Sequence, residues 1–325
     1  MYNAFFGLRD RPFDLAPDPR FLFLTAPQHV ALSTLRYGLM SQRGLALLIG
    51  EAGTGKTTLI HAVLSELGTG VLSVLMDNPR LTRQEFYEYL AEGFRFGTAA
   101  AHSKTQFLTS LRRLLEERHA AGQHTALILD EAQSLSYELL EEVRLLSNIE
   151  TPTTKLLNVI LAGQQELAER LNEPELRQLK QRISLRAELT PFDEAATSAY
   201  VAGRLRIAGG SPATIFSREA VQAIHPASGG VPRLINVLCD NALINGFAAQ
   251  VRPVTRALVE EVIRDFDMGN LREVAAVRPE PVKSSTPQIA PRDQDARAES
   301  SDADPPTARP ALFEFSTKRR RFSFF

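Results

Sequence analysis

Residues 50 to 57 combine three glycines, a lysine and two threonines at a spacing that suits the binding of phosphate groups. The run is followed by a third threonine, and in full it reads Gly50-Glu51-Ala52-Gly53-Thr54-Gly55-Lys56-Thr57-Thr58. Glycines let the backbone curl so that successive N–H groups point at phosphate oxygens, and a helix that starts here adds its positive end. The Lys56 ammonium would reach the outer phosphates, and the Thr57 hydroxyl would hold Mg²⁺. The motif therefore predicts binding of ATP with Mg²⁺.

Two adjacent carboxylates, Asp130 and Glu131, follow the apolar run 126–129. Such a pair could simply begin a loop. In a chain that also has a phosphate-binding loop, however, such a carboxylate pair has specific roles in hydrolysis. Asp130 can hold a Mg²⁺-bound water, and Glu131 can orient the water that attacks the γ-phosphate. The pair therefore favours ATP hydrolysis over nucleotide binding alone.

Hydrolysis also develops negative charge that an arginine can stabilise, often from a neighbouring subunit. Arg177 and Arg182 stand just before the strand-like run 185–189, and Arg233 starts a predicted helix after Gly229-Gly230. Any one of these arginines could instead be an ordinary surface charge. Arg182 and Arg233 are the favoured candidates because of their positions relative to the motifs.

Short apolar runs alternate with amphipathic stretches between residues 27 and 162. The runs predict strands over 45–49, 71–76, 126–129 and 156–162, and those over 45–49 and 126–129 have the composition of buried strands. The stretches between them predict helices over 27–41, 105–119, 136–148, a segment that ends near 67 and another that the capping pattern Thr82…Glu85 opens. Strands that alternate with helices indicate an α/β fold, with a parallel sheet sandwiched by helices.

The pattern changes after Thr190-Pro191, where strand-like runs stop. Residues 193–267 predict a helical lid domain, with Ser217 as an N-cap and Gly229-Gly230 as a break. Beyond residue 271 the chain is rich in proline and poor in large apolar residues, which predicts a disordered tail. The tail ends in a tip, 313–325, with five phenylalanines around four cations. The predicted divisions are an arm and helix (1–43), an ATPase domain (44–191), a lid (192–268) and a tail (269–325). Within the first, aromatics and prolines alternate over residues 1–25, which predicts an irregular arm instead of a helix.

Composition sets the class of protein. The chain has 325 residues, 44% hydrophobic and 23% charged, as in globular proteins, and its net charge of −1 gives no overall attraction to nucleic acid or anionic lipid. The single cysteine, Cys239, lies among apolar residues and is expected to be buried. No apolar run is long enough to span a membrane, and the first residues lack the pattern of a secretory signal. The expected location is the cytoplasm.

Several motifs, in order along the chain, resemble one known family. Residues 1 to about 268 are similar to the AAA+ ATPases of the general secretion pathway protein A (ExeA-like) family. Similar proteins include the ATPase of exosortase and exopolysaccharide systems and, more distantly, helper ATPases of transposons. Besides the phosphate-binding loop, the resemblance rests on Asp130-Glu131-Ala132-Gln133, Leu161-Ala162-Gly163-Gln164, the run 174–183, Gly230-Val231-Pro232-Arg233 and the opening segment 1–21.

The resemblance implies an AAA+ sheet domain followed by a helical lid. It implies that Gln164 is the sensor 1 residue, Arg182 the arginine finger and Arg233 the sensor 2 residue. It also implies that Asn78 is the residue that holds the catalytic glutamate until a partner binds. An arginine finger that acts on a neighbouring subunit would make a homo-oligomer the active unit.

The tail departs from the pattern of the family. Secretion-pathway members often continue into a transmembrane helix and a peptidoglycan-binding domain, where this sequence has the proline-rich tail and its Phe/Arg tip. The shorter branch, which works on the cytoplasmic side of an envelope secretion or polysaccharide export system, is the better match. The expected client is a protein of such a system. The tip would contact a partner, or anionic lipid at the inner membrane.

Two other functions stay open. A DNA-associated helper ATPase of the transposition or replication type would need a basic face, which the neutral net charge does not favour. A small-molecule kinase would share the phosphate-binding loop, but Glu131 and the Gly-Val-Pro-Arg segment of the lid argue against it. Stimulation by DNA would indicate the first function, and phosphate release without an acceptor would exclude the second as the sole activity.

Overall fold

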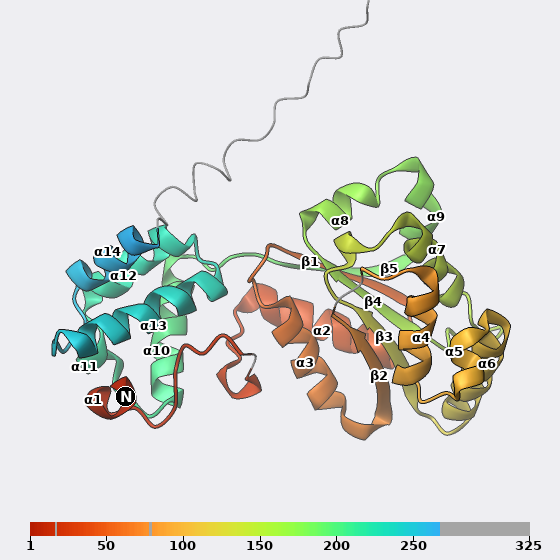
Figure 1. The fold of residues 1–325 in the computed structure, drawn as a ribbon, viewed down its shortest axis with the longest axis horizontal. Helices are drawn as coiled ribbons and strands as arrows, with labels where there is room; N and C mark the ends of the chain where they lie inside the picture. Colours follow the sequence, from red (N-terminus) through yellow and green to blue (C-terminus); the bar gives the residue numbers. More distant parts are fainter. Residues whose placement is uncertain (17, 78–79, 267–325) are drawn as a thin grey trace, which may run out of the picture. The chain divides into compact units, whose positions relative to one another are not determined.

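A five-stranded parallel sheet forms the centre of the domain that precedes the helical region, and this part of the chain is called the sheet domain (Figure 1). The computed structural model describes residues 1–16, 18–77 and 80–266. The strand order is β2-β3-β4-β1-β5, so β1 and β4 are neighbours although most of the domain separates them in sequence. The strands are β1 (Leu45–Gly50), β2 (Val71–Met76), β3 (His124–Leu129), β4 (Asn158–Gly163) and β5 (Ile183–Leu189).

The parallel register brings the carboxyl ends of the strands to one edge of the sheet. Ile49 pairs with Gly163, Met76 with Leu129, and Leu129 with Leu161. The residues that follow β1, β3 and β4 therefore emerge side by side. In open parallel sheets this edge is where ligands bind.

Side chains alternate between the two faces of the sheet, as a strand period of two requires. In β1, Leu45 and Leu47 belong to one core cluster, whereas Ala46 and Leu48 belong to another. Helices α2 (Ala26–Met40) and α3 (Lys56–Leu67) cover the second face. The first face is covered by α4 (Arg83–Gly93), α6 (Lys104–Ala120) and α7 (Tyr137–Leu146).

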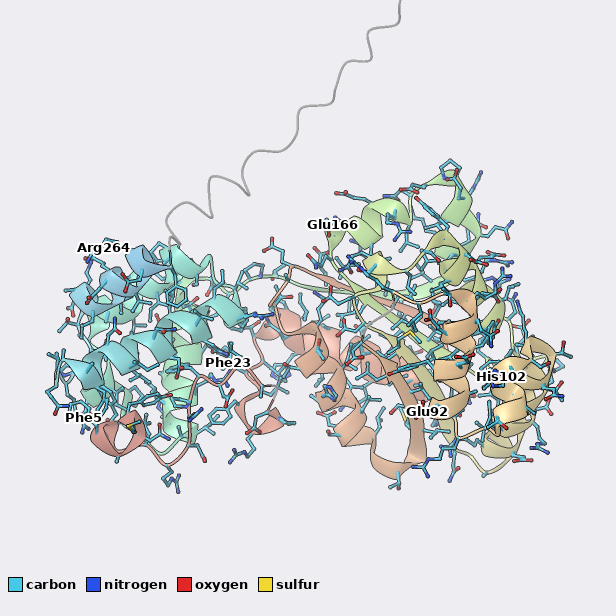
Figure 2. The ribbon with its side chains drawn as sticks, in the orientation of Figure 1. Phe5, Phe23, Glu92, His102, Glu166 and Arg264 are labelled. Carbon is cyan, nitrogen blue, oxygen red and sulfur yellow. The ribbon has the colours of Figure 1, made fainter. Side chains whose placement is uncertain are left out.

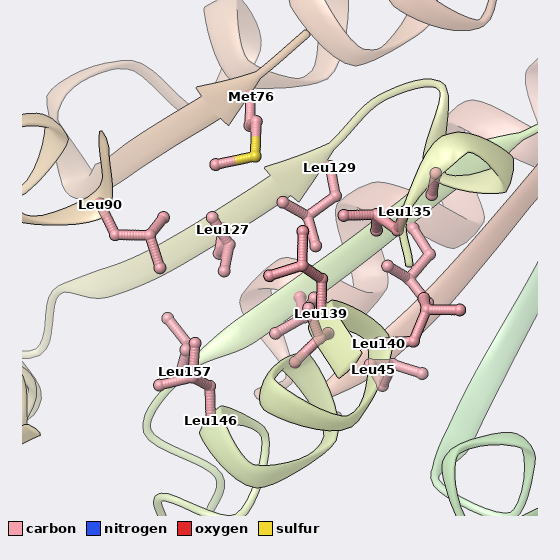
Figure 3. Close-up of a cluster of buried hydrophobic side chains, with 14 of the residues drawn as sticks. Leu45, Met76, Leu90, Leu127, Leu129, Leu135, Leu139, Leu140, Leu146 and Leu157 are labelled. Carbon is pink, nitrogen blue, oxygen red and sulfur yellow. The ribbon is translucent and has the colours of Figure 1, made fainter. Parts of the chain in front are cut away.

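Figure 3 shows the core on the first face, where leucines of β1, β3, α4 and α7 gather. Leu127, Leu129 and Leu140 have no exposed surface. Full burial of each such side chain contributes about 1.5–3 kcal/mol to folding, so this core holds the strand ends that carry the site in place.

Short elements connect the main ones. They are α5 (Thr98–His102), α8 (Gln165–Arg170), α9 (Arg177–Lys180) and the 3₁₀ turns η1 (Pro19–Phe21), η2 (Gly68–Gly70), η3 (Ala132–Ser134) and η4 (Pro174–Leu176). Two of them lie at the carboxyl edge of the sheet, where η3 follows β3 and α8 follows β4.

The lid is helical, as the sequence predicts after residue 191. It consists of α10 (Glu194–Ile207), α11 (Pro212–Ile215), α12 (Arg218–Ser228), α13 (Pro232–Ala248) and α14 (Arg256–Asp265). The predicted N-cap is confirmed, since the Ser217 side chain accepts a hydrogen bond from Ala220 N, and α12 ends at Gly229. Cys239 is buried in the core of the lid.

The N-terminal arm packs into the core of the lid. Phe6 and Phe13 are each 1% exposed and belong to the same cluster as Leu205 and Leu243. In Figure 2, Phe5 and Phe23 mark two points along the arm. Phe5 stacks edge-on against Phe247 at 5.6 Å between ring centroids. The arm thus contributes aromatic side chains to a domain that begins almost two hundred residues later in the chain.

Two local predictions are wrong. Residues 2–6 form a one-turn helix, α1 (Tyr2–Phe6), instead of an irregular arm, because Tyr2 and Phe6 are four residues apart and bury the same side in the lid core. The predicted strand 156–162 starts only at Asn158. Leu156 is buried, but its N–H bonds to Ile149 O in a tight turn, so an apolar run alone does not mark where the strand begins.

Three predictions concern residues outside the described ranges: Asn78, the tail 269–325 and its Phe/Arg tip. In the part of the chain that the structure describes, no helix combines the length and apolarity that crossing a bilayer requires.

Candidate nucleotide-binding site

The loop after β1 folds around the side chain of Lys56. The Lys56 ammonium is buried and donates to the carbonyl oxygens of Gly50 at 2.9 Å and Glu51 at 3.1 Å. Burial lowers the pKa of Lys56, while the carboxylates of Glu131, Asp130 and Glu166 oppose that shift. An ammonium has three donors. Two of these donors are therefore used within the chain. A phosphate near the ammonium would offset the cost of burying its charge.

Thr57, in the first turn of α3, meets Asp130 at the end of β3. The Thr57 hydroxyl donates to Asp130 Oδ2 at 2.5 Å, and Asp130 is 3% exposed. Hydroxyl and carboxylate oxygens are hard donors of the kind that Mg²⁺ takes. Among the described residues no three His, Cys, Asp or Glu side chains gather as a metal site. The donor set thus fits a Mg²⁺ ion that takes its remaining ligands from phosphates and water.

Glu131 has a strained backbone, with φ 49° and ψ 36° in the left-handed region. Its N–H bonds to Asp130 Oδ1 at 2.9 Å, and η3 continues directly from it. The left-handed conformation costs a non-glycine residue about 1–2 kcal/mol. In return, the turn aims the Glu131 side chain at the pocket beside the phosphate-binding loop.

The carboxylate of Glu131 is held by two glutamines. Gln133 Nε2 donates to Glu131 Oε2 at 2.5 Å, and Gln164 Nε2 donates to the same oxygen at 3.3 Å. Gln164 is the residue after β4, so the β3–β4 neighbour relation brings it to Glu131. Sequence reasoning named Gln164 but gave Gln133 no role.

The lid touches the phosphate-binding loop through the start of α13. Arg233 N donates to Gly53 O at 3.2 Å. A Cβ atom at position 53 would stand 2.8 Å from Arg233 Cβ, and Gly53 has a φ of +80°. Glycine is therefore required here both for backbone conformation and for close approach of the lid. The contact places Arg233 on the wall of the pocket.

The turn before α13 is fixed by Gly230. Phe192 N donates to Gly230 O at 2.8 Å, and a Cβ atom at position 230 would stand 1.9 Å from Phe192 O. Phe192 lies in the connection from β5 to the lid. This backbone contact sets where the Val231-Pro232-Arg233 segment meets the loop.

A pocket of about 380 Å³ lies between the loop, the lid and the arm. That volume is within the range of small-ligand and cofactor sites. The loop side comprises 53–59, the lid side includes Tyr200, Arg204, Arg233 and Asn236, and the arm side comprises 14–16, 18 and 21–24. The arm and the lid helix α10 are the parts of this pocket that sequence reasoning missed, because no motif marks them.

Arg204 ties the arm to the lid at the pocket wall. This guanidinium is only 7% exposed, donates to Pro12 O and to the Tyr200 hydroxyl, and lies 4.8 Å over the ring of Phe21. Burial of a charge is costly unless donors are satisfied. The contacts of Arg204 therefore help to explain why this segment of the arm follows the pocket.

Arg182 stands elsewhere. It directly precedes β5, whose first residue Ile183 pairs with Leu45 at the start of β1. Arg182 thus lies near the amino ends of the strands, opposite the edge that carries the loop, and is absent from the pocket lining of its own chain. Of the other predicted residues, 53–58, Glu131 and Arg233 line the pocket, and Asp130 and Gln164 reach it through Thr57 and Glu131.

Comparison with known protein families identifies the sheet domain. The family model described as an AAA domain matches residues 39–171, which include β1 to β4 and the side chains of Lys56, Asp130 and Glu131. A curated relative, general secretion pathway protein A of Aeromonas hydrophila, is 41% identical over 248 residues, which is 76% of this chain. This chain is an AAA-domain relative of general secretion pathway protein A. It spans 45% of the length of that relative.

Solved structures share the fold. The ORC2 protein of Aeropyrum pernix in its ADP form superposes with a TM-score of 0.61 at 16% identity, over 79% of this chain and 73% of that one. The structure of Drosophila ORC bound to DNA superposes with a TM-score of 0.61 at 19% identity, over 81% of this chain and 66% of that one. At such identities the likeness establishes the AAA-type fold of sheet and helical lid.

Proposed function

We propose that this AAA-domain protein binds ATP with Mg²⁺ and hydrolyses it to ADP and phosphate. One observation carries the proposal: Lys56, the Thr57–Asp130 pair and the Glu131 carboxylate converge at one edge of the sheet beside a pocket of about 380 Å³. The kinship with general secretion pathway protein A supports it.

Each side chain has a role that its chemistry suits. Lys56, the backbone of 50–55 and Arg233 bind the phosphates, Thr58 adds contact from the first turn of α3, and Thr57 with Asp130 holds the metal. The metal neutralises charge on the phosphates when it is bound. Glu131 accepts a hydrogen bond from the attacking water and aims it at the γ-phosphorus.

The active unit in this proposal is a homo-oligomer. The position of Arg182 away from its own pocket supports a role on the pocket of the neighbouring subunit, where its charge would stabilise the transition state. Gln164 would sense the γ-phosphate through its contact with Glu131.

The biological role in this proposal is the assembly or regulation of an envelope secretion or polysaccharide export system, from its cytoplasmic side. The 41% sequence identity to general secretion pathway protein A, over 76% of this chain, supports this role. The client would be a protein of that system, driven by the nucleotide-dependent position of the lid against the loop.

The test uses the full chain and two substitutions. Glu131→Gln should bind ATP as tightly as wild type and lose at least about a hundredfold in turnover, because only the water-orienting carboxylate is removed. Lys56→Ala should lose nucleotide affinity as well, because the buried ammonium meets the phosphates. Binding of a fluorescent ATP analogue and phosphate release are measured separately. Wild-type turnover in both variants would contradict the proposed site.

The same phosphate-release assay distinguishes DNA, anionic lipid and a second copy of the chain as partners. Turnover is measured with duplex DNA, with anionic vesicles and with neither, across a range of protein concentrations. A rate stimulated by DNA and sensitive to salt would replace the export role by the DNA-associated one. A rate that rises with protein concentration alone would support the oligomer.

A further inference from the structure

Gln133 occupies the space between the catalytic carboxylate and the end of β4. Its side-chain amide makes two hydrogen bonds of opposite polarity: Nε2 donates to Glu131 Oε2 at 2.5 Å, and Oε1 accepts from Gln164 N at 3.1 Å. Both are possible only with this orientation of the amide, because a carboxylate accepts and a backbone N–H donates. A glutamine is thus matched to its two neighbours atom by atom.

The backbone around Gln133 is fixed as well. Arg170 of α8 donates from one nitrogen to Gln133 O at 2.6 Å and to Leu135 O at 2.9 Å. Gly163 leaves room for the amide, since a Cβ atom at position 163 would stand 2.9 Å from Gln133 Oε1. The segment from Gly163 at the end of β4 to Arg170 of α8, in which Figure 2 labels Glu166, therefore holds both the main chain and the side chain of Gln133.

The two bonds act on one oxygen of Glu131. Oε2 accepts from Gln133 and from Gln164, whereas Oε1 accepts no hydrogen bond from the residues that the structure describes. A carboxylate that is held by one oxygen and free at the other can orient a water with little loss of rotational freedom at the moment of reaction. Because the side chain of Glu131 lines the pocket, the free oxygen is available to that water.

We propose that Gln133 is a positioning residue for ATP hydrolysis, which clamps Oε2 of Glu131 so that Oε1 orients the attacking water. The inference rests on the proposed function. Gln133 touches neither nucleotide nor metal in this proposal and acts only through Glu131. Its removal should therefore lower kcat and leave nucleotide binding unchanged.

Gln133→Met tests the clamp, because methionine keeps the length of the side chain and removes both hydrogen bonds. We expect kcat to fall about ten- to a hundredfold, as for loss of a hydrogen bond to a charged group, with KM and the affinity for a fluorescent ATP analogue within about twofold of wild type. Gln133→Glu should lose more, since it sets a second carboxylate against Oε2. Gln123→Met, at an exposed glutamine just before β3 that does not line the pocket, is the matched control and should match wild type.

A double-mutant cycle separates positioning from a general packing effect. In single-turnover assays, Gln133→Met should have no further effect once Glu131→Gln is present, whereas a packing defect would slow both backgrounds equally. Full kcat in Gln133→Met, or additive losses in the cycle, would overturn the inference while wild-type hydrolysis upholds the proposed function. A wild-type chain without turnover in every condition would overturn both.

Discussion

Lys56 and Asp130 are among the most deeply buried charged side chains of the sheet domain, with exposed fractions of 5% and 3%. Charges in such surroundings interact more strongly than in water, and each needs a partner of opposite sign or satisfied hydrogen bonds. The chain supplies Lys56 with two carbonyl oxygens and Asp130 with the hydroxyl of Thr57 and the N–H of Glu131. These contacts hold the side chains where phosphate and metal would meet them.

The proposed Mg²⁺ site can be tested by removing one oxygen atom, the hydroxyl of Thr57. Thr57→Ala should raise the Mg²⁺ concentration needed for half-maximal ATPase activity by about tenfold or more, because it removes a ligand oxygen and a partner of Asp130. Thr57→Ser keeps the hydroxyl and should stay near wild type. The measurement is a Mg²⁺ titration of phosphate release at saturating ATP. Equal Mg²⁺ requirements in the two variants would contradict the assignment.

At the scale of elements, a main-chain contact sets the lid against the loop. Gly230 can carry no side chain, because a Cβ atom there would overlap Phe192 O. Its neighbour Gly229 also has a positive φ, +59°, but nothing lies within 4 Å of its Cβ position. Alanine substitutions at the two positions therefore distinguish the cost of a steric overlap from the cost of backbone strain.

Gly230→Ala should lower the free energy of unfolding by at least about 3 kcal/mol and should weaken ATP binding, because relief of the overlap displaces the start of α13 from the loop. Gly229→Ala should cost only about 1 kcal/mol, which is the strain of a left-handed alanine. Urea unfolding and nucleotide binding measure the two effects. Equal costs at both positions would mean that the Phe192 contact does not limit the lid.

The arm is a second element whose role is set by packing. Phe6 is 1% exposed in the lid core, whereas Leu15, further along the arm, is 56% exposed. Phe6→Ala should cost about 3–5 kcal/mol, from lost burial and the cavity left behind. Leu15→Ala should stay within about 0.5 kcal/mol. Urea denaturation gives both values, and a small effect at Phe6 would show that the arm does not stabilise the lid.

At the scale of the whole molecule, one chain does not bring every proposed catalytic group to one pocket. Arg182 lies near the amino ends of β1 and β5, and Lys56 and Glu131 lie at the carboxyl ends. A pocket completed by Arg182 therefore requires a second copy of the chain. The requirement predicts a rate that depends on protein concentration.

Arg182→Ala should bind the ATP analogue normally and lose about a thousandfold in turnover, the lower range for loss of an arginine finger. Mixing it with Glu131→Gln, which is also impaired in turnover, should restore part of the rate, because a mixed interface joins an intact Glu131 to an intact Arg182. The control mixes Glu131→Gln with Lys56→Ala,Arg182→Ala, in which no interface is complete. Equal rates in both mixtures would contradict a shared site.

The local chemistry and the sheet domain were accessible from sequence because both depend on near neighbours. The spacing of glycines, Lys56 and Thr57 predicts a loop between strand and helix, and the structure has that loop between β1 and α3. Apolar runs predict four strands and a strand-like run at 185–189, which correspond to the five strands of the sheet. Asp130 then lies beside Thr57, since consecutive βα units place strand ends at one edge. The start of β4 was misplaced because Leu156 and Leu157 are buried without belonging to the strand.

Contacts between distant parts of the chain were decided only by the tertiary structure. The Arg204–Pro12 hydrogen bond joins residues 192 apart, and the Gln164–Glu131 bond joins residues 33 apart. No spacing rule in the sequence encodes such pairs, because they arise from strand order and from which aromatic side chains fill the lid core. The sequence by itself therefore determined which residues are proposed to bind phosphate and metal. The fold alone determined that the arm walls the pocket and that Gln133 meets Glu131.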